Sequence, residues 1–284
     1  MISGSTAVYG IFGYPVKHTF SPGMQNTAFQ AVGIDACYLP FPVSPENLSN
    51  AVRSMRVLGI QGLNITVPHK ELIIPHLDEL SEEARLIGAV NTIEVREGKL
   101  VGHNTDGRGF LRSLRDDARF SPKGKRVLFI GSGGAARAVG FSLALAGAAW
   151  IRFIDIDWEK AGALADDIRS RTGANALSID DDALTETARE ADALINATPL
   201  GLKRTDPLPL SPRHLRKGHL VCDLVYNPPE TSFLKTARLA GAKRLPGLGM
   251  LLFQGVIAFE IWTGRKAPVE KMRSALKRQI RGIR

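Results

Sequence analysis

Short runs of β-forming apolar residues alternate with longer stretches of helix formers through the second part of the chain. This alternation is typical of a doubly wound sheet of parallel strands with helices on both faces. The spacing predicts strands at residues 127–130, 150–155, 176–179, 193–196, 220–225 and 243–245, and helices at 135–145, 158–171 and 231–240.

The first part of the chain also reads as an α/β domain. We expect strands at 7–12, 37–41 and 62–66, helices from Ser21 and at 45–55, and a hairpin of 89–95 and 99–103 that turns at Glu97-Gly98. Ser21-Pro22 resembles a helix cap followed by proline in the first turn. The polar segment 115–125, which contains Pro122 and Gly124, is a candidate linker.

The last stretch of the chain predicts two helices. Residues 249–262 are almost all apolar, and Val269, Met272, Leu276 and Ile280 recur at helical spacing. Because the second sheet is complete before them, we expect these helices to return to the first domain. The predicted domains are therefore 1–114, 115–248 and a C-terminal part, 249–284.

Composition narrows the class of protein. The chain has 284 residues, of which 44% are hydrophobic and 23% charged, enough for two folded domains. The net charge of +9 is dispersed, so we expect a solvated surface that favours anionic ligands, with no nucleic-acid and no membrane partner. We find no secretory signal and no membrane span, and the two distant cysteines, Cys37 and Cys222, predict neither disulfide nor metal site. These features favour the cytoplasm.

One segment carries the strongest functional signal, a strand that runs through a glycine turn into a helix. Gly131 suits a sharp turn, Gly133 lets a pyrophosphate approach the backbone, and the small Ala136 permits close packing of helix and strand. The helix N-terminus, near Gly134 and Ala135, offers N–H donors to phosphate. A second strand ends at Asp155, where dinucleotide-binding folds place a carboxylate for the ribose hydroxyls. The pattern predicts a Rossmann-type dinucleotide site.

Eight motifs, including this glycine turn, occur in a recognisable order between about Tyr9 and Trp262. In combination they resemble the shikimate dehydrogenase family, including its quinate/shikimate branch. They are Gly13-Tyr-Pro-Val-Lys-His18-Thr-Phe-Ser21-Pro, Asn64-Ile-Thr-Val-Pro-His-Lys70, Gly88-Ala-Val-Asn91-Thr, Asn104-Thr-Asp106-Gly, Gly131-Ser-Gly-Gly-Ala-Ala-Arg137, Asn196-Ala-Thr-Pro199-Leu-Gly, Asp223-Leu-Val-Tyr226-Asn-Pro and Gly247-Leu-Gly249-Met-Leu-Leu-Phe-Gln254.

The resemblance implies a role for individual residues. Lys70 and Asp106 match the catalytic lysine and its partner carboxylate, which handle the proton of the oxidised hydroxyl. The first domain is then the substrate-binding catalytic domain and the second binds the dinucleotide. The matching substrate residues are Thr19 and Ser21 for the carboxylate, and Thr66, Asn91, Tyr226 and Gln254 for the ring. The matching cofactor residues are Gly131, Gly133, Gly134, Ala135, Asp155, Asn196, Thr198 and Gly249.

The chain departs from the family pattern at the carboxylate motif. Family members commonly carry Ser-Lys-Ser where this chain has Thr19-Phe20-Ser21. The choice between shikimate, quinate and a related hydroxy-cyclohexane carboxylate therefore stays open, as do the direction of the pathway and the choice between monomer and homodimer.

The cofactor expectation rests on the end of the second strand. NADP-using members typically have Asn-Arg-Thr there, whereas this chain has Asp155-Ile-Asp157. A carboxylate accepts hydrogen bonds from ribose hydroxyls and repels a 2′-phosphate, although Lys160 offers partial compensation. We therefore expect NAD to be preferred over NADP.

Three alternatives remain beside this interpretation. A methylenetetrahydrofolate dehydrogenase has a similar plan and also uses a lysine, but the Asn104-Thr-Asp106 motif favours a small polyhydroxy acid. A dinucleotide-sensing regulator without chemistry is disfavoured by the presence of both Lys70 and Asp106. A nucleic-acid binder, suggested only by charge, predicts salt-sensitive binding to DNA or RNA.

Overall fold

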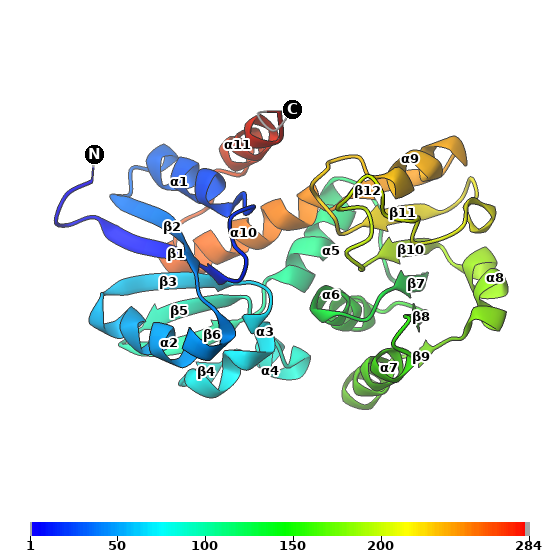
Figure 1. The fold of residues 1–284 in the computed structure, drawn as a ribbon, viewed down its shortest axis with the longest axis horizontal. Coiled ribbons are helices and arrows are strands. Elements are labelled where there is room, and N and C mark those ends of the chain that lie inside the picture. Colours follow the sequence, from blue (N-terminus) through cyan, green and yellow to red (C-terminus); the bar gives the residue numbers. More distant parts are fainter. Residues whose placement is uncertain (1, 282–284) are drawn as a thin grey trace. The chain divides into compact units, whose positions relative to one another are not determined.

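The computed structural model describes residues 2–281 and divides them into two compact units. The first unit contains the chain up to Thr105 together with the segment from Gln254 onward, and the second contains Asp106–Phe253. Each unit is an α/β structure built on a six-stranded sheet (Figure 1). The predicted fold class is confirmed, including the return of the C-terminal helices to the first unit. The helix that begins at Asp106 belongs to the second unit, whereas residues 106–114 were expected in the first domain.

The sheet of the first unit is mixed, with the strand order β2-β1-β3-β5-β6-β4. β1 pairs with β2 and β3 in parallel, and β5 pairs with β3 and β6 in antiparallel fashion. Its elements are β1 (Ala7–Gly13), α1 (Ser21–Ala31), β2 (Ala36–Pro42), α2 (Leu48–Val57), β3 (Ile60–Ile65), α3 (His69–Leu72), β4 (Glu79–Leu80), α4 (Glu82–Ile87), β5 (Thr92–Arg96), β6 (Lys99–His103) and α11 (Val269–Arg281), with short 3₁₀ turns at Pro45–Asn47 and Ile74–His76.

Apolar side chains cover both faces of this sheet. On one face Leu48, Val52 and Met55 of α2 pack on Leu63 of β3 and Ile93 of β5. The other face is aromatic and includes the last part of α10 (Leu248–Thr263). There Tyr9 packs on Phe29 and on Trp262, with ring centroids 5.0 and 5.3 Å apart, and the Trp262 indole donates a hydrogen bond to the Ile93 carbonyl (2.9 Å).

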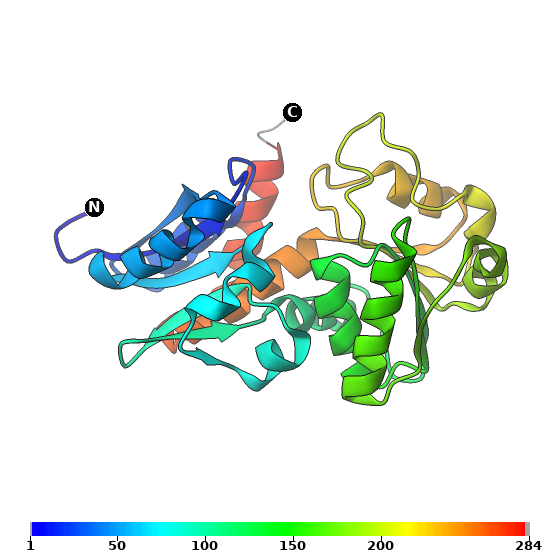
Figure 2. The ribbon, with the colours of Figure 1, turned by 60° about the horizontal axis from the view of Figure 1, so that its bottom comes forward.

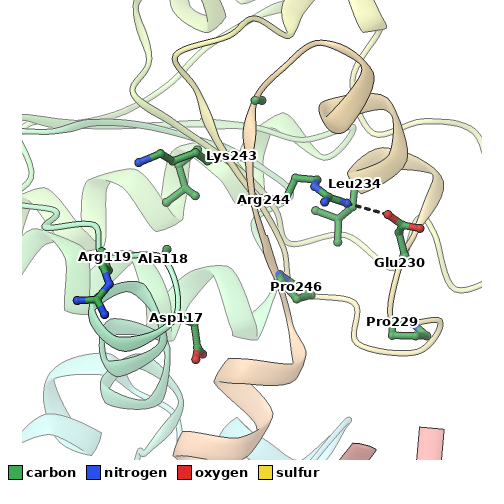
Figure 3. A pocket seen from close by; sticks show the side chains of 11 residues that line it. Asp117, Ala118, Arg119, Pro229, Glu230, Leu234, Lys243, Arg244 and Pro246 are labelled. Carbon is green, nitrogen blue, oxygen red and sulfur yellow. Dashed lines mark hydrogen bonds and ion pairs between the residues drawn. The ribbon is translucent and has the colours of Figure 1, made fainter. Parts of the chain in front are cut away.

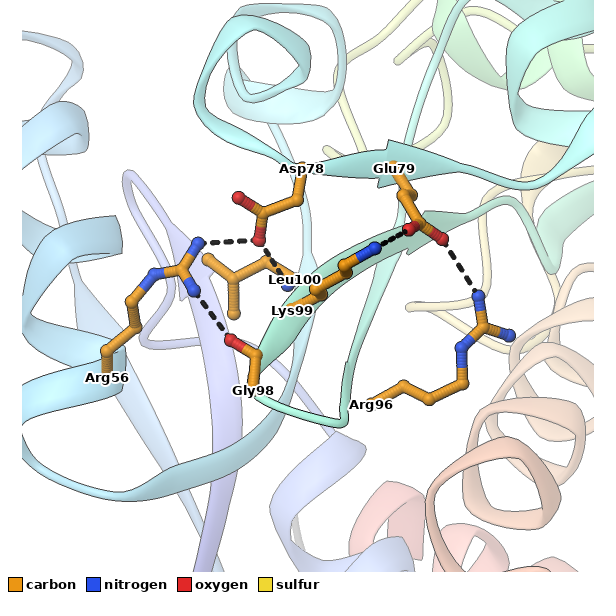
Figure 4. Close-up of polar contacts among 7 residues, drawn as sticks. All are labelled: Arg56, Asp78, Glu79, Arg96, Gly98, Lys99 and Leu100. Carbon is orange, nitrogen blue, oxygen red and sulfur yellow. Dashed lines mark hydrogen bonds and ion pairs between the residues drawn. The ribbon is translucent and has the colours of Figure 1, made fainter.

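The hairpin of β5 and β6 turns as the sequence predicts, with positive φ angles at Glu97 (52°) and Gly98 (77°). Figure 4 shows how ion pairs fasten this hairpin to its neighbours. Glu79 of β4 accepts from Lys99 and Arg96, and Asp78 binds Arg56 of α2 (2.6 Å) and the backbone N–H of Leu100 (2.6 Å). These contacts fasten the hairpin turn, at the end of β5 and the start of β6, to β4 and α2.

The sheet of the second unit is entirely parallel, with the strand order β12-β11-β10-β7-β8-β9. This is the order of a six-stranded dinucleotide-binding sheet, which reverses between its first and fourth strands, here β7 and β10. Its elements are α5 (Asp106–Asp116), β7 (Arg126–Ile130), α6 (Gly134–Leu145), β8 (Trp150–Ile154), α7 (Trp158–Thr172), β9 (Ala176–Ser178), α8 (Asp181–Glu190), β10 (Ala193–Asn196), a 3₁₀ turn at Pro212–His214, β11 (Leu220–Asp223), α9 (Ser232–Leu239) and β12 (Lys243–Pro246).

Helices cover both faces of this sheet (Figures 1 and 2). Alternate residues of β7 point to opposite faces of the sheet. On one face Leu128 packs in a cluster with Ala188 of α8 and Phe233 of α9. On the opposite face Phe129 stacks on Phe153 at 4.9 Å, and Gly140 of α6 lies close to Phe153 and to Ile168 of α7. This architecture brings the carboxyl ends of all six strands to one edge of the sheet.

The elements β4, α3, α4 and α8 were not predicted from the sequence. Within α8 only Ala188 is buried, and the helix contains few apolar residues that could mark it in the sequence. The helix is fixed at its start by Asp180, whose side chain accepts a hydrogen bond from the Ala183 N–H (2.9 Å). Among residues 2–281, no helix is long and apolar enough to cross a membrane.

Candidate functional site

A buried polar network crosses the first unit near the carboxyl ends of β3 and β6 and the start of β5. The Tyr38 hydroxyl donates to Asn64 Oδ1 (2.7 Å), and Asn64 Nδ2 donates to the Asn91 carbonyl (3.2 Å) and to the Thr92 hydroxyl (3.1 Å). Asn91 continues the network, since Nδ2 donates to Thr105 Oγ1 (2.9 Å) and Oδ1 accepts from the Thr105 N–H (2.8 Å). All five side chains are at most 4% exposed. Such a satisfied network holds its members in fixed positions.

The two residues predicted to bind a carboxylate lie at the start of α1. Ser21 is the first residue of that helix and is 3% exposed, and its N–H donates to Thr19 Oγ1 (3.3 Å). The Ser21 hydroxyl hydrogen-bonds Tyr38, whose pKa is raised well above its ordinary value by burial and lowered in smaller part by this bond. Ser21 therefore joins the same network as Asn91.

Lys70 lies on α3, immediately after the strand that carries Asn64. Its carbonyl accepts a hydrogen bond from the Val90 N–H (2.8 Å), which fixes the backbone of α3 beside Asn91. Thr66 begins the turn that leads into α3, since its carbonyl accepts a hydrogen bond from the His69 N–H (2.9 Å). Lys70 and Thr66 are both partly buried. The structure thus brings Lys70, Asn91 and Thr105 to one region of the first unit.

Asp106 and Gln254 are the residues at which the chain passes between units. Asp106 is the first residue of α5, is 5% exposed and follows Thr105 directly, so its backbone is anchored by the hydrogen bonds of Thr105 to Asn91. Gln254 is 8% exposed within α10. The neighbouring Gly255 carbonyl accepts from Gln25 Nε2 (3.0 Å) of α1.

The glycine turn of the second unit has the geometry that a dinucleotide requires. Gly131 follows β7 with φ of 99°, a left-handed conformation that favours glycine, and a Cβ there would lie 2.8 Å from Thr198 Cγ2. At Gly133 and Gly134 an added Cβ would meet no atom within 4 Å, so the backbone borders open space. Gly134 begins α6, with Ala135 in its first turn, and a helix start with free N–H groups binds phosphate. These residues fit a pyrophosphate.

Asp155 lies at the end of β8, but its side chain is engaged within the protein. Oδ2 accepts from the Ser132 N–H and from Ser132 Oγ, each at 2.7 Å, and Oδ1 accepts from the Asp157 N–H at 3.1 Å. Burial raises the pKa of Asp155, but these hydrogen bonds together with the charge of Lys160 outweigh it, so the pKa is lowered. Asp155 therefore braces the glycine turn.

The remaining cofactor and substrate candidates of this unit lie in loops after β10 and β11 and at the start of α10. Asn196 ends β10 and binds Thr198 through two hydrogen bonds to its Oδ1 (3.1 and 2.6 Å). Tyr226 follows β11, and burial raises its pKa. Gly249 faces α5, where a Cβ would lie 2.1 Å from Ser113 Oγ, so close helix packing accounts for the glycine.

A cavity of about 590 Å³ lies elsewhere on the second unit, beside the edge strand β12 (Figure 3). It includes Arg119, Lys243 and the ion pair between Arg244 and Glu230 (2.7 Å). None of the predicted site residues lines it. In the described part of the chain, no group of three or more histidine, cysteine, aspartate or glutamate side chains is placed to hold a metal ion.

Several members of the site were not predicted from the sequence. Tyr38, Thr92 and Thr105 complete the buried network, and Ser132 is the partner of Asp155. Thr92, Thr105 and Ser132 lie inside the motifs quoted above, so their place in the sequence could have identified them as site residues. Tyr38 reaches the network from β2, an element with no recognised motif, so only the fold reveals it.

The fold and the site define a dehydrogenase-like class of protein, with a dinucleotide-binding unit joined to a second α/β unit that carries a lysine beside a buried hydroxyl and amide network. Two family models identify the class of dehydrogenase more closely. Residues 11–93 match the shikimate dehydrogenase substrate binding domain, and residues 247–277 match the shikimate 5′-dehydrogenase C-terminal domain.

Whole-chain comparisons agree. A relative named shikimate dehydrogenase (NADP(+)) from Desulforamulus reducens is 50% identical, over 98% of this chain and 97% of its own. A solved shikimate dehydrogenase in complex with NADP+ is 40% identical with a TM-score of 0.92, covering 99% of this chain and 98% of that one. Shikimate 5-dehydrogenase from Listeria monocytogenes, solved with shikimate and NAD, is 36% identical with a TM-score of 0.91, covering 97% and 98%. The chain belongs to the shikimate dehydrogenase family.

These relatives overturn the expected NAD preference, which is wrong. The curated relatives at 45–50% identity are named NADP(+)-dependent. The physical reason lies in Asp155, which was assigned to the ribose hydroxyls. Its oxygens accept hydrogen bonds from Ser132 and Asp157, so its presence after the second strand is explained by the turn that it braces.

Proposed function

We propose that this protein is an NADP-linked shikimate dehydrogenase, which interconverts shikimate and 3-dehydroshikimate. The observation that carries the proposal is the buried network that joins Ser21, Asn91 and Thr105 beside the backbone of Lys70. It provides hydroxyl and amide groups for a small polyhydroxy acid, within a member of the shikimate dehydrogenase family.

The substrate carboxylate is assigned to the hydroxyls of Thr19 and Ser21 at the start of α1. Hydroxyl donors there bind an anion without adding a buried charge, and Ser21 is held by its bond to Tyr38. The ring hydroxyls are assigned to Asn91, Thr66, Gln254 and Tyr226. Asn91 is well suited, because both ends of its side-chain amide are held by Thr105 and its orientation is therefore fixed.

Lys70 and Asp106 are assigned to the proton of the oxidised hydroxyl. When an alcohol loses hydride, its hydroxyl proton must leave as well, and a positioned base assists this step. The Lys70 amine takes the proton, and the Asp106 carboxylate holds and relays it. Support comes from the Lys70 carbonyl bonded to Val90 and from Asp106 following Thr105, which tie both backbones to the residues around Asn91.

The dinucleotide supplies the hydride acceptor. Gly131, Gly133, Gly134 and Ala135 hold its pyrophosphate, and Asn196 and Thr198 line the neighbouring loop. For the 2′-phosphate we assign Lys160, whose charge acts on Asp155 and whose side chain is exposed on α7. A lysine binds phosphate as a point charge.

Initial rates with shikimate and with quinate, each with NADP+ and with NAD+, test this proposal. We expect the highest kcat/KM for shikimate with NADP+. A higher kcat/KM for quinate would make the protein a quinate dehydrogenase, the second candidate left open by Thr19 and Phe20. Coenzyme binding without turnover of either acid would instead favour a dinucleotide-sensing regulator.

A further inference from the structure

Asp223 is a fully buried carboxylate at the end of β11 that the reaction described above does not use. Its Oδ1 accepts hydrogen bonds from Asn196 Nδ2 (2.9 Å) and from the Val225 N–H (3.0 Å), and its Oδ2 accepts from the Thr231 hydroxyl (2.6 Å). Burial raises its pKa, and the three hydrogen bonds only partly offset that effect. Burying a carboxylate is costly unless hydrogen bonds or an opposite charge compensate it, and here the three donors compensate it in part.

Asn196 passes this anchoring to the loop that follows β10. While Nδ2 binds Asp223, it also donates to the Leu200 carbonyl (3.0 Å), and Oδ1 accepts from the N–H and the hydroxyl of Thr198. The Thr198 hydroxyl in turn accepts from the Leu200 N–H (3.1 Å). The loop from Thr198 to Leu200 is thus fixed by an amide whose own orientation is set by Asp223.

The loop held in this way touches the glycine turn. A Cβ on Gly131 would lie 2.8 Å from Thr198 Cγ2 and 3.0 Å from the backbone of Ala197, so the two loops are in close contact. The oxygen that binds Asn196, Asp223 Oδ1, also accepts from the Val225 N–H, which fixes the backbone directly before Tyr226. One carboxylate therefore organises the loops after β10 and β11 and, through Thr198, supports the turn after β7.

The position of these loops decides which part of the coenzyme depends on them. In a doubly wound sheet each half binds one mononucleotide at the carboxyl ends of its strands. By this rule the half formed by β7, β8 and β9, which carries the glycine turn, would hold the adenosine end, and the half formed by β10, β11 and β12 would hold the nicotinamide end.

We propose that Asp223 is a positioning residue that pre-forms the nicotinamide half of the coenzyme site through Asn196 and the Thr198–Leu200 loop. The proposal rests on the proposed function, because it presumes a nicotinamide dinucleotide. Its physical basis is pre-organisation, since a loop that is ordered before binding does not lose that freedom when the ligand arrives.

The test compares whole coenzyme with its adenosine half. Affinities for NADP+ and for 2′,5′-ADP are measured by calorimetry for the unaltered protein, Asp223→Ala and Asp223→Asn. For Asp223→Ala we expect about a tenfold weaker affinity for NADP+, the size expected from leaving buried donors unpaired, with the affinity for 2′,5′-ADP unchanged. Asp223→Asn keeps one acceptor oxygen for Asn196 and Val225, so we expect it to restore most of the NADP+ affinity.

Asp192→Asn is the matched control. Asp192 is a partly buried carboxylate that, like Asp223, accepts a backbone hydrogen bond from a neighbouring segment, here the Arg126 N–H (2.9 Å), but it stands at the amino ends of β7 and β10. We expect its variant to bind both ligands as the unaltered protein does. If Asp223→Ala does not fold by circular dichroism, Asp223→Ser, which leaves room for a water and keeps a hydroxyl, takes its place.

The proposal is overturned if the alanine or serine variant binds NADP+ normally, or loses 2′,5′-ADP to the same extent as NADP+. The second result would indicate a general structural role. Failure of the unaltered protein to bind NADP+ would instead contradict the proposed function, so the two failures are distinguishable.

Discussion

Ser132 donates two hydrogen bonds, each 2.7 Å long, to the same carboxylate oxygen of Asp155. One comes from its backbone and one from its hydroxyl, so the residue between the glycines is tied to the end of β8. The acidic residue that a sequence pattern assigns to the ribose thereby has a structural role. Its local charge is also offset by donors and by Lys160.

Ser132→Ala removes the hydroxyl bond and should loosen the glycine turn. We expect the free energy of unfolding at neutral pH to fall by about 1 kcal/mol, the usual contribution of one such bond, together with weaker coenzyme binding. Denaturant unfolding and coenzyme titration measure the two effects. The control is Ser170→Ala, at an exposed serine of α7. Ser142 of α6 is unsuitable as a control because its side chain contacts Gly107.

The stability lost in Ser132→Ala should depend on pH. Because the pKa of Asp155 is lowered in the folded protein, its ionised form contributes stability above the ordinary value of 3.8, and this is lost as the pH falls through the lower folded value. The difference between the two proteins should therefore be constant near neutrality and shrink below about pH 4. A difference that grows on acidification would contradict this account of Asp155.

Lys70→Ala tests the proton-handling assignment. We expect kcat to fall about a thousandfold, within the range for loss of a general base, while the dissociation constant of NADP+ stays unchanged. Lys99→Ala, which removes an exposed partner of Glu79, is the matched control and should retain turnover. Near-native kcat in Lys70→Ala would remove Lys70 from the mechanism.

Lys160→Ala tests the site assigned to the 2′-phosphate. Loss of one cation from a partly exposed phosphate contact should raise KM for NADP+ about tenfold and leave KM for NAD+ unchanged. Lys235→Ala, an exposed lysine on α9, is the control. An equal rise for both coenzymes would show that Lys160 acts on the turn and does not read the phosphate.

His219 predicts acid sensitivity of the second unit. Burial, and to a smaller extent the charge of Arg216, lowers its pKa from 6.5 to about 4. Below pH 6.5 the unfolded chain takes up a proton that the folded protein does not accept until about pH 4. The free energy of unfolding therefore decreases as the pH is lowered from 6.5 to about 4. The slope from this one group approaches about 1.4 kcal/mol per pH unit. Denaturant unfolding of His219→Gln across this range should show a shallower slope, and an unchanged slope would exclude this origin.

The architecture of the second unit was predictable because its strands are short apolar runs bounded by glycine and polar turns, and because Gly131 marks the start of a nucleotide site. The structural role of Asp155 was not predictable from the sequence. Its partner Ser132 stands 23 positions earlier, and only the pairing of β7 with β8 brings the two residues together. The same limit applied to Tyr38, whose hydroxyl reaches Asn64 across β1. Helix α8 was missed because it buries little apolar surface.

The most direct test of the account follows the hydrogen that is transferred. Shikimate carrying deuterium on the carbon of the oxidised hydroxyl is incubated with NADP+ and the purified protein, and the products are analysed by mass spectrometry. We predict equal amounts of 3-dehydroshikimate and of NADPH that carries the deuterium. Absence of reduction, or deuterium released to water, would contradict the assignment of this protein as a shikimate dehydrogenase.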